Sequence, residues 1–193
     1  MDRSAFIFSH SSSTTAFSAS ASPEQAENSI TCISPTKTFN LAGIQTSAVI
    51  VPDNTLRRKL RDGLHARRID GANAFAVQAA AAAFSNGGEW LDELRVYLFR
   101  NKQLVREYLE SDLPEIRLTP SQATYLLWLD ARALQKDARM TLAQGIRNRS
   151  GLYLSEGTQF GTGGEGFLRM NIACPRSLVL EGLERLERAA KGM

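Results

Sequence analysis

A single lysine stands among hydroxyl-bearing residues at the end of a short apolar run. Residues 34–43 read SPTKTFNLAG, with the lysine at position 37. A lysine amine in mostly apolar surroundings loses its proton more easily than in water, and a neutral amine can form a Schiff base. The hydroxyl groups of Ser34, Thr36 and Thr38 are suited to hydrogen bonds with a phosphate. Because the same residue types are common in exposed turns, these residues alone leave an ordinary surface turn as the alternative.

A second candidate is Arg169, which interrupts a largely apolar run at residues 167–173, FLRMNIA. A guanidinium held in a rigid strand can bind a carboxylate through two parallel hydrogen bonds, the arrangement that an amino-acid substrate would use. The alternative is an ion pair with one of the chain's own acidic residues. The preceding stretch is rich in glycine, and we interpret it as a mobile loop near the substrate without a phosphate site. Its glycines are Gly157, Gly161, Gly163, Gly164 and Gly166.

The elements that must position these residues follow from hydrophobic periodicity. Short β-branched apolar runs predict strands at 30–33 and 47–51, one on each side of the lysine run. Leucines at positions i, i+4 and i+8 predict an amphipathic helix through residues 56–64, with basic residues on its other faces. An alanine-rich helix over 72–84, which we expect to be buried, and a longer helix over 91–111 follow.

Beyond residue 112 the predicted strands and helices alternate, which is typical of a compact α+β unit. Strands are expected near 116–118, 125–129 and 167–172, and helices near 134–147 and 177–190. Near the start of the chain, residues 9–22 are mostly Ser, Thr and Ala, which cannot repay the entropy of ordering. We expect a loop there rather than a transit peptide, because amphipathic arginines are missing.

Composition excludes several classes of function. The 193 residues are 43% hydrophobic, enough for a core, and carry a formal charge of only +3, which does not favour a nucleic-acid or membrane partner. No apolar run approaches the roughly 20 residues of a membrane span. Two histidines without a neighbouring cluster predict no metal site. Cys32 and Cys174 lie in apolar runs and are expected to be buried free thiols in a reducing, cytoplasmic setting.

The lysine run resembles the signature of fold-type-I enzymes that use pyridoxal 5′-phosphate (PLP). More specifically, it is similar to the MalY/PatB group of cystathionine β-lyases within the class I/II aminotransferase superfamily. The similarity continues through residues 69–90, 125–130 and 161–175. The resemblance therefore covers nearly everything after about residue 17.

The resemblance implies a role for each candidate residue. Lys37 is expected to hold PLP covalently and to act as the catalytic base. Ser34 is expected to contact the cofactor phosphate, and Thr36 is a further cofactor-binding candidate because of its neighbouring hydroxyl group. Gln45 stands where many aminotransferases have a phosphate-binding arginine, so it offers only neutral hydrogen bonds to the phosphate, which should be bound more weakly there. Arg169 is expected to bind the substrate carboxylate.

The resemblance also implies an α/β fold of the PLP-dependent transferase type, that of aspartate aminotransferase. We expect a loop or disordered N-terminal segment over 1–29 and a remnant of the PLP-binding large domain, with the lysine loop, over 30–92. A C-terminal α+β small domain with the interdomain helix is expected over 93–193. In the resembling enzymes the aspartate and aromatic residue that contact the cofactor ring lie upstream, so we expect the first half of the large domain to be missing. The isolated chain should then bind PLP weakly or need a partner.

The implied activity is β-elimination. Cystathionine or another cysteine S-conjugate would be converted to a thiol, pyruvate and ammonia, and a homodimer would be the active form. Two alternatives remain open at this point. A class I/II aminotransferase would use the same lysine and arginine, and a catalytically inactive fragment or interaction module would use neither.

Overall fold

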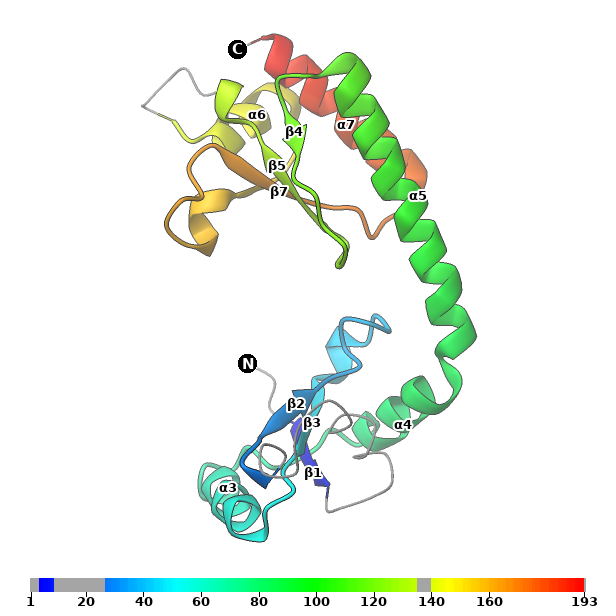
Figure 1. Ribbon diagram of the computed structural model, residues 1–193, viewed down its shortest axis with the longest axis vertical. Coiled ribbons are helices and arrows are strands. Elements are labelled where there is room, and N and C mark those ends of the chain that lie inside the picture. The colour runs from blue at the N-terminus through cyan, green and yellow to red at the C-terminus, as the bar shows by residue number, and fades with distance from the viewer. Residues whose placement is uncertain (1–3, 9–26, 135–139, 193) are drawn as a thin grey trace. The chain divides into compact units, whose positions relative to one another are not determined.

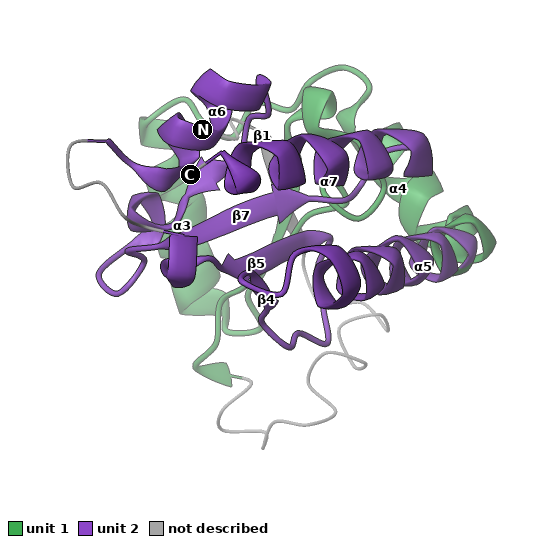
Figure 2. Cartoon of the chain, turned by 90° about the horizontal axis from the view of Figure 1, so that it is seen from above, with its two compact units in different colours: residues 1–92 green, residues 93–193 purple. Residues whose placement is uncertain are grey.

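The computed structural model describes residues 4–8, 27–134 and 140–192. For residues 4–8 the description is of the backbone. The chain forms two compact units, residues 1–92 and 93–193 (Figure 2). The boundary falls inside helix α5 (Gly88–Asp112). None of the described helices is long and apolar enough to cross a bilayer.

Unit 1 contains a three-stranded sheet in the order β1-β3-β2 (Figure 1). Strand β2 (Thr31–Ile33) runs antiparallel to β3 (Thr46–Ile50), while β1 (Ser4–Phe8) runs parallel to it. The expectation of a loop or disordered segment over 1–29 is therefore wrong for Ser4–Phe8. Ser4–Phe8 pairs in parallel with β3. The polarity of the neighbouring residues in the sequence does not indicate this pairing. Residues 9–26, including the Ser/Thr-rich stretch, lie outside the described residues.

Two helices follow the sheet of unit 1. Helix α3 (Asn54–Ala66) begins after Asp53, whose carboxylate accepts a hydrogen bond from Leu56 N at 2.6 Å, a standard N-cap. Helix α4 (Ala76–Asn86) was expected to be buried, but within this chain only Ala76 is. Alanine-rich helices permit close packing, and burial follows only where a neighbour covers them.

The two cysteines differ from the expected buried thiols. Cys32 is exposed, because it alternates with Thr31 and Ile33 on an edge strand and its side chain is on the less covered face. Cys174 is half-buried, and burial raises the pKa of its thiol. Both are free.

Unit 2 is built around a four-stranded antiparallel sheet in the order β4-β5-β7-β6. The long helix α5 and helices α6 (Leu142–Ser150) and α7 (Arg176–Lys191) pack their apolar side chains against one face of it. The helix expected from residue 134 starts instead at Leu142, capped by Thr141, and residues 135–139 are outside the described residues. The strands are β4 (Arg117–Leu118), β5 (Leu126–Asp130), β6 (Ser155–Glu156) and β7 (Phe167–Asn171).

The strands of unit 2 alternate between two faces, as the period of a β-strand requires. Leu127, Leu129, Leu168 and Met170 point into the core, where they meet residues of α5, α6 and α7. Arg169, between two of these core residues, lies on the other face of the sheet. Packing of Leu168 and Met170 in the core therefore sets the orientation of β7, and this orientation places Arg169 on the opposite face of the sheet.

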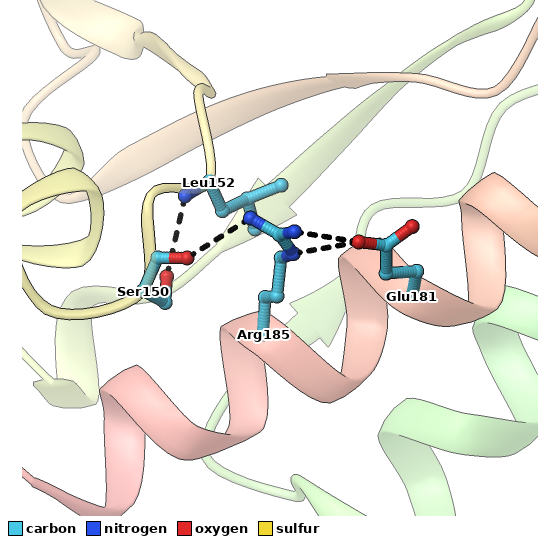
Figure 3. A network of polar contacts seen from close by, with 4 residues as sticks. All are labelled: Ser150, Leu152, Glu181 and Arg185. Atoms are coloured by element: carbon cyan, nitrogen blue, oxygen red, sulfur yellow. Dashed lines mark hydrogen bonds and ion pairs between the residues drawn. The ribbon is translucent and has the colours of Figure 1, made fainter.

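A polar network joins helix α7 to the end of α6 (Figure 3). Arg185 Nη1 donates to Ser150 O at 3.2 Å, and its Nε and Nη2 donate to Glu181 Oε1 at 3.0 and 2.6 Å. Ser150 Oγ accepts from Leu152 N at 3.4 Å. The carbonyl of Ser150 is one of those that a helix end leaves without an intrahelical partner, so Arg185 satisfies it.

We expect Arg185→Ala to lower the free energy of unfolding by about 1 kcal/mol, because a helix-end carbonyl loses its donor. Glu181→Ala should cost less than about 0.5 kcal/mol, since the Arg185 and Glu181 side chains are 37% and 48% exposed and exposed pairs contribute little. Urea denaturation of the two variants measures the difference. Equal losses would contradict the view that the carbonyl contact dominates.

Candidate active site

Lys37 projects from a tight turn that follows strand β2. Phe39 N donates to Pro35 O and Leu41 N to Thr36 O, both at 2.9 Å, which closes the turn around the lysine. Asn40 adopts a left-handed backbone with φ of 55°, a conformation that asparagine tolerates better than most residues. The Lys37 side chain is exposed, so the turn presents its amine outward.

The hydroxyl groups beside Lys37 hydrogen-bond to each other. Ser34 Oγ donates to Thr46 O at 2.7 Å and lies 2.7 Å from Thr36 Oγ1. Because a hydroxyl has one proton, and Ser34 gives its own to Thr46, Thr36 is the donor within the pair. Thr36 N also donates to Ser34 Oγ at 3.2 Å. Both protons are thus used inside the turn, and Ser34 must rotate before it can donate to a phosphate.

Gln45 and Thr46 complete the polar surroundings of the turn. Gln45 is exposed and has a left-handed backbone, φ 51°, at the end of the 3-10 turn Ala42–Ile44. Thr46 is completely buried, and its Oγ1 has no hydrogen-bond partner among the described residues. Such groups are rare in folded proteins because they forgo the hydrogen bond that water would supply. Thr46 was not among the residues singled out from the sequence, because a threonine in a strand is unremarkable there.

An aromatic cluster holds the lysine turn against the corner between α4 and α5. The ring of Phe39 meets Phe84 edge-on at 5.9 Å between centroids and lies 6.1 Å from the ring of Trp90. It also packs directly on Gly87, where a Cβ atom would come within 2.5 Å of Phe39 Cε1. Phe39 is two residues from Lys37, so the corner sets the position of the turn.

Arg169 lies in the other unit, half-buried on strand β7. Its Nη2 donates a long hydrogen bond of 3.4 Å to Ser155 Oγ, and its Cζ lies 4.1 Å from the centroid of the Phe160 ring. Among the described residues, Arg169 forms no ion pair with a carboxylate. It is therefore a cation that the described part of the chain does not neutralise.

The glycine-rich stretch before Arg169, interpreted from the sequence as a mobile loop, contains the 3-10 turn η3 (Gly157–Phe160) and a close backbone crossing. A Cβ atom at Gly157 would lie 2.3 Å from Gly164 O. Phe167 N donates to Gly164 O at 3.1 Å. The two glycines serve this crossing, and the stretch places Phe160 over Arg169.

The structure thus brings Ser34 and Thr36 into contact next to Lys37 and places Gln45 at the end of the same segment. The phosphate and carboxylate roles of these residues and of Arg169 stay predictions. The donor set in unit 1, an exposed amine with neighbouring hydroxyl groups and a neutral amide, fits a phosphorylated aldehyde such as PLP. The described residues contain no group of three or more His, Cys, Asp or Glu that could hold a metal ion.

Comparison with known proteins gives consistent matches. Residues 4–186 match the family model "Aminotransferase class I and II". The chain is 42% identical over 172 residues to cystathionine beta-lyase PatB of Bacillus subtilis, covering 89% of this chain and 44% of that protein. It is 30% identical over 161 residues to protein MalY of Escherichia coli, covering 83% of this chain and 41% of that protein.

Solved structures agree with these matches. Cystalysin from Treponema denticola, which contains a pyridoxal 5′-phosphate cofactor, superposes with a TM-score of 0.83 at 32% identity, covering 89% of this chain and 43% of that one. A PLP-bound C-S lyase from Staphylococcus hominis gives a TM-score of 0.76 at 30% identity, covering 85% and 42%. The chain spans less than half the length of each of these relatives.

Proposed function

Because the chain belongs to the class I and II aminotransferase family, we propose that it provides the lysine and arginine of a PLP-dependent carbon-sulfur β-lyase. The observation that carries the proposal is the turn formed by the run SPTKTFNLAG. In this turn the exposed Lys37 lies beside the hydrogen-bonded hydroxyl groups of Ser34 and Thr36. The names of the relatives favour elimination over transamination. PatB at 42% identity is a cystathionine β-lyase, and the Staphylococcus hominis neighbour is a C-S lyase.

The proposed substrate is cystathionine or another cysteine S-conjugate. With one water molecule consumed, the products are a thiol, pyruvate and ammonia. When bound, PLP would supply an electron sink for the negative charge that removal of the α-proton leaves. Lys37 would hold the cofactor through its Nζ, and its amine would take the α-proton of the substrate. Ser34, supported by Thr36, and Gln45 hydrogen-bond the phosphate. Arg169 holds the substrate carboxylate through two N–H groups.

A class I/II aminotransferase is the second candidate, supported by the family model itself. In that reaction Lys37 would move the proton without expulsion of the thiolate. Release of free thiol from cystathionine distinguishes the two reactions, since a transaminase leaves the carbon-sulfur bond intact. A catalytically inactive fragment is the third, since the chain covers 44% of PatB.

We also propose that the chain assembles as a homodimer. Several large apolar side chains are exposed on and next to helices α4 and α5, and apolar surface of this kind is typical of protein interfaces. They are Phe75, Val77, Phe84, Val96 and Phe99. A mass measurement by size-exclusion chromatography with light scattering tests the proposal, and a stable monomer at micromolar concentration would contradict it.

We expect PLP to label Lys37 selectively but weakly. The purified chain is mixed with PLP, reduced with borohydride and digested, and the labelled peptides are identified by mass spectrometry. Label should gather on Lys37 at low PLP, because the neighbouring hydroxyl groups retain the phosphate, and it should be lost in Lys37→Arg, whose guanidinium forms no Schiff base. Lys59, Lys102 and Lys191, on helices, serve as internal controls. Equal labelling of all four lysines would refute the assignment.

A further inference from the structure

The face of the unit 2 sheet opposite the core has a continuous series of aromatic and cationic contacts. Phe160 covers Arg169, with 4.1 Å between Cζ and the ring centroid, and meets Trp128 at 5.8 Å and an interplanar angle of 73°. Trp128 stacks on Phe167 at 5.7 Å and 17°, and Arg132 lies 5.0 Å from the Phe167 centroid. The series starts from the arginine proposed to bind the substrate carboxylate.

The two cations of this series are in different states. Arg132 forms a two-point ion pair with Asp130, through Nε at 2.8 Å and Nη2 at 2.7 Å. Within the part of the chain that the structure describes, Arg169 has only Ser155 Oγ, at 3.4 Å from one nitrogen, together with the Phe160 ring. Arg132 is therefore neutralised within the chain, whereas Arg169 keeps N–H groups for a ligand.

A ring over a guanidinium face acts on both orientation and hydration. The guanidinium donates its hydrogen bonds in its own plane, so a ring stacked on one face leaves the donating edge open. The ring attracts the cation and removes water from that face, which strengthens an ion pair formed at the edge. Ser155, the cross-strand neighbour of Arg169, restrains the Nη2 end.

Phe160 is itself 48% exposed, so burial alone does not hold it in place. Two features do. The Gly157 and Gly164 backbones cross so closely that neither position has room for a Cβ atom, which fixes the turn that carries Phe160. Trp128 then supports the ring from the side, and Trp128 is the direct cross-strand neighbour of Arg169.

We propose that Phe160 is a positioning residue of the carboxylate site, which holds the plane of the Arg169 guanidinium so that its N–H edge accepts an α-carboxylate. The inference rests on the proposed function of Arg169. It adds the reason for an aromatic residue at position 160 and for the glycine crossing that places it. The ligand class is an α-amino carboxylate, for which S-methyl-L-cysteine is the probe.

The experiment follows the reaction of Arg169 with phenylglyoxal, mapped by peptide mass spectrometry on the full chain. S-methyl-L-cysteine should slow modification of Arg169 in the wild type, while S-methyl-L-cysteine amide, which lacks the carboxylate, should not. In Phe160→Leu the concentration needed for half-protection should rise about two- to fivefold, the range of a cation-π contact at a partly exposed site. Phe160→Tyr keeps the ring and should restore protection. The exposed Arg149 reports the general reactivity of each sample.

Two results would overturn the inference. Full protection in Phe160→Leu would show that the ring does not position Arg169. Failure of the amino acid to protect Arg169 in the wild type would show that the arginine binds no carboxylate. Labelling of Lys37 by PLP is measured separately in the same variants, so loss of this inference and loss of the proposed function are distinguishable. Thermal unfolding midpoints, together with the Phe160→Tyr variant, separate a local effect from a failure to fold.

Discussion

Gly87→Ala is expected to displace the lysine turn and to lower the stability of unit 1. The added Cβ would lie 2.5 Å from Phe39 Cε1 and 2.5 Å from Ala83 O, far inside van der Waals contact. The carbonyl belongs to the last turn of α4 and moves only with the helix, so the ring must leave its place. We expect a loss of about 1–3 kcal/mol, typical of an overpacked site. Thermal unfolding and PLP labelling of Lys37 measure the two consequences.

The adjacent glycine gives a matched control. A Cβ at Gly88 meets nothing within 4 Å, and the residue opens helix α5, so Gly88→Ala should leave stability unchanged or raise it by up to about 1 kcal/mol. Phe39→Leu in the Gly87→Ala background should recover part of the lost stability, because a smaller side chain relieves the contact. If the two glycine variants behave alike, Phe39 is not held by this corner, and the positioning of Lys37 needs another explanation.

The sequence predicts the local structure around both site residues. The β-branched runs on each side of Lys37 give strands β2 and β3, and the leucine spacing from residue 56 gives α3. The two-residue alternation around Arg169 gives β7, with the arginine on the face away from the core. In each case the signal comes from residues within one element, where the period of the side chains is imposed by the backbone alone.

What the sequence does not predict are contacts between distant segments. Nothing local indicates that Ser4–Phe8 pairs with β3, since the pairing joins residues about 40 positions apart. The contact of Phe39 with Gly87 also joins segments that are distant in the sequence. The exposure of most of helix α4 likewise depends on which other segments pack against it. Phe160 is nearer to Arg169 in sequence, but its role depends on the crossing at Gly157 and Gly164, and glycines in a row indicate only a loop. Residues that support a site are therefore harder to find than residues that react.

Asn101 is such a supporting residue on helix α5, and it gives the prediction with the largest expected loss of stability. Its side chain is completely buried, and Nδ2 donates to Ile172 O and Cys174 O, both at 3.1 Å. These carbonyls follow strand β7 directly, so Asn101 anchors the end of the strand that carries Arg169. Its Oδ1 has no hydrogen-bond partner in residues 4–8, 27–134 and 140–192. Both donors of the side chain are therefore used, and its acceptor is not.

Asn101→Asp keeps the shape but removes both donors and sets a carboxylate against two carbonyl oxygens. At pH 7 we expect a loss of about 3–5 kcal/mol, since a buried charge without a partner is among the most costly substitutions. Asn101→Leu removes the same two hydrogen bonds without adding a charge and should cost about 2–4 kcal/mol. Urea denaturation of both variants and the wild type measures the losses, and a larger loss for the leucine variant would contradict the charge argument.

The pH dependence separates the charge from the lost hydrogen bonds. Burial beside two carbonyl oxygens disfavours the ionised form of the introduced carboxyl, so its pKa is higher in the folded than in the unfolded chain. Below about pH 3 both states hold the proton, the acid can donate to one carbonyl, and the loss is at its smallest. As the pH rises, the unfolded chain releases the proton first, so stability relative to the wild type falls by about 1.4 kcal/mol per pH unit until the folded form also ionises. The deficit of Asn101→Leu has no such titration and should stay constant over the same range. A flat profile for Asn101→Asp would mean that water reaches the carboxyl, and the end of β7 would then be less tightly anchored than the two hydrogen bonds indicate.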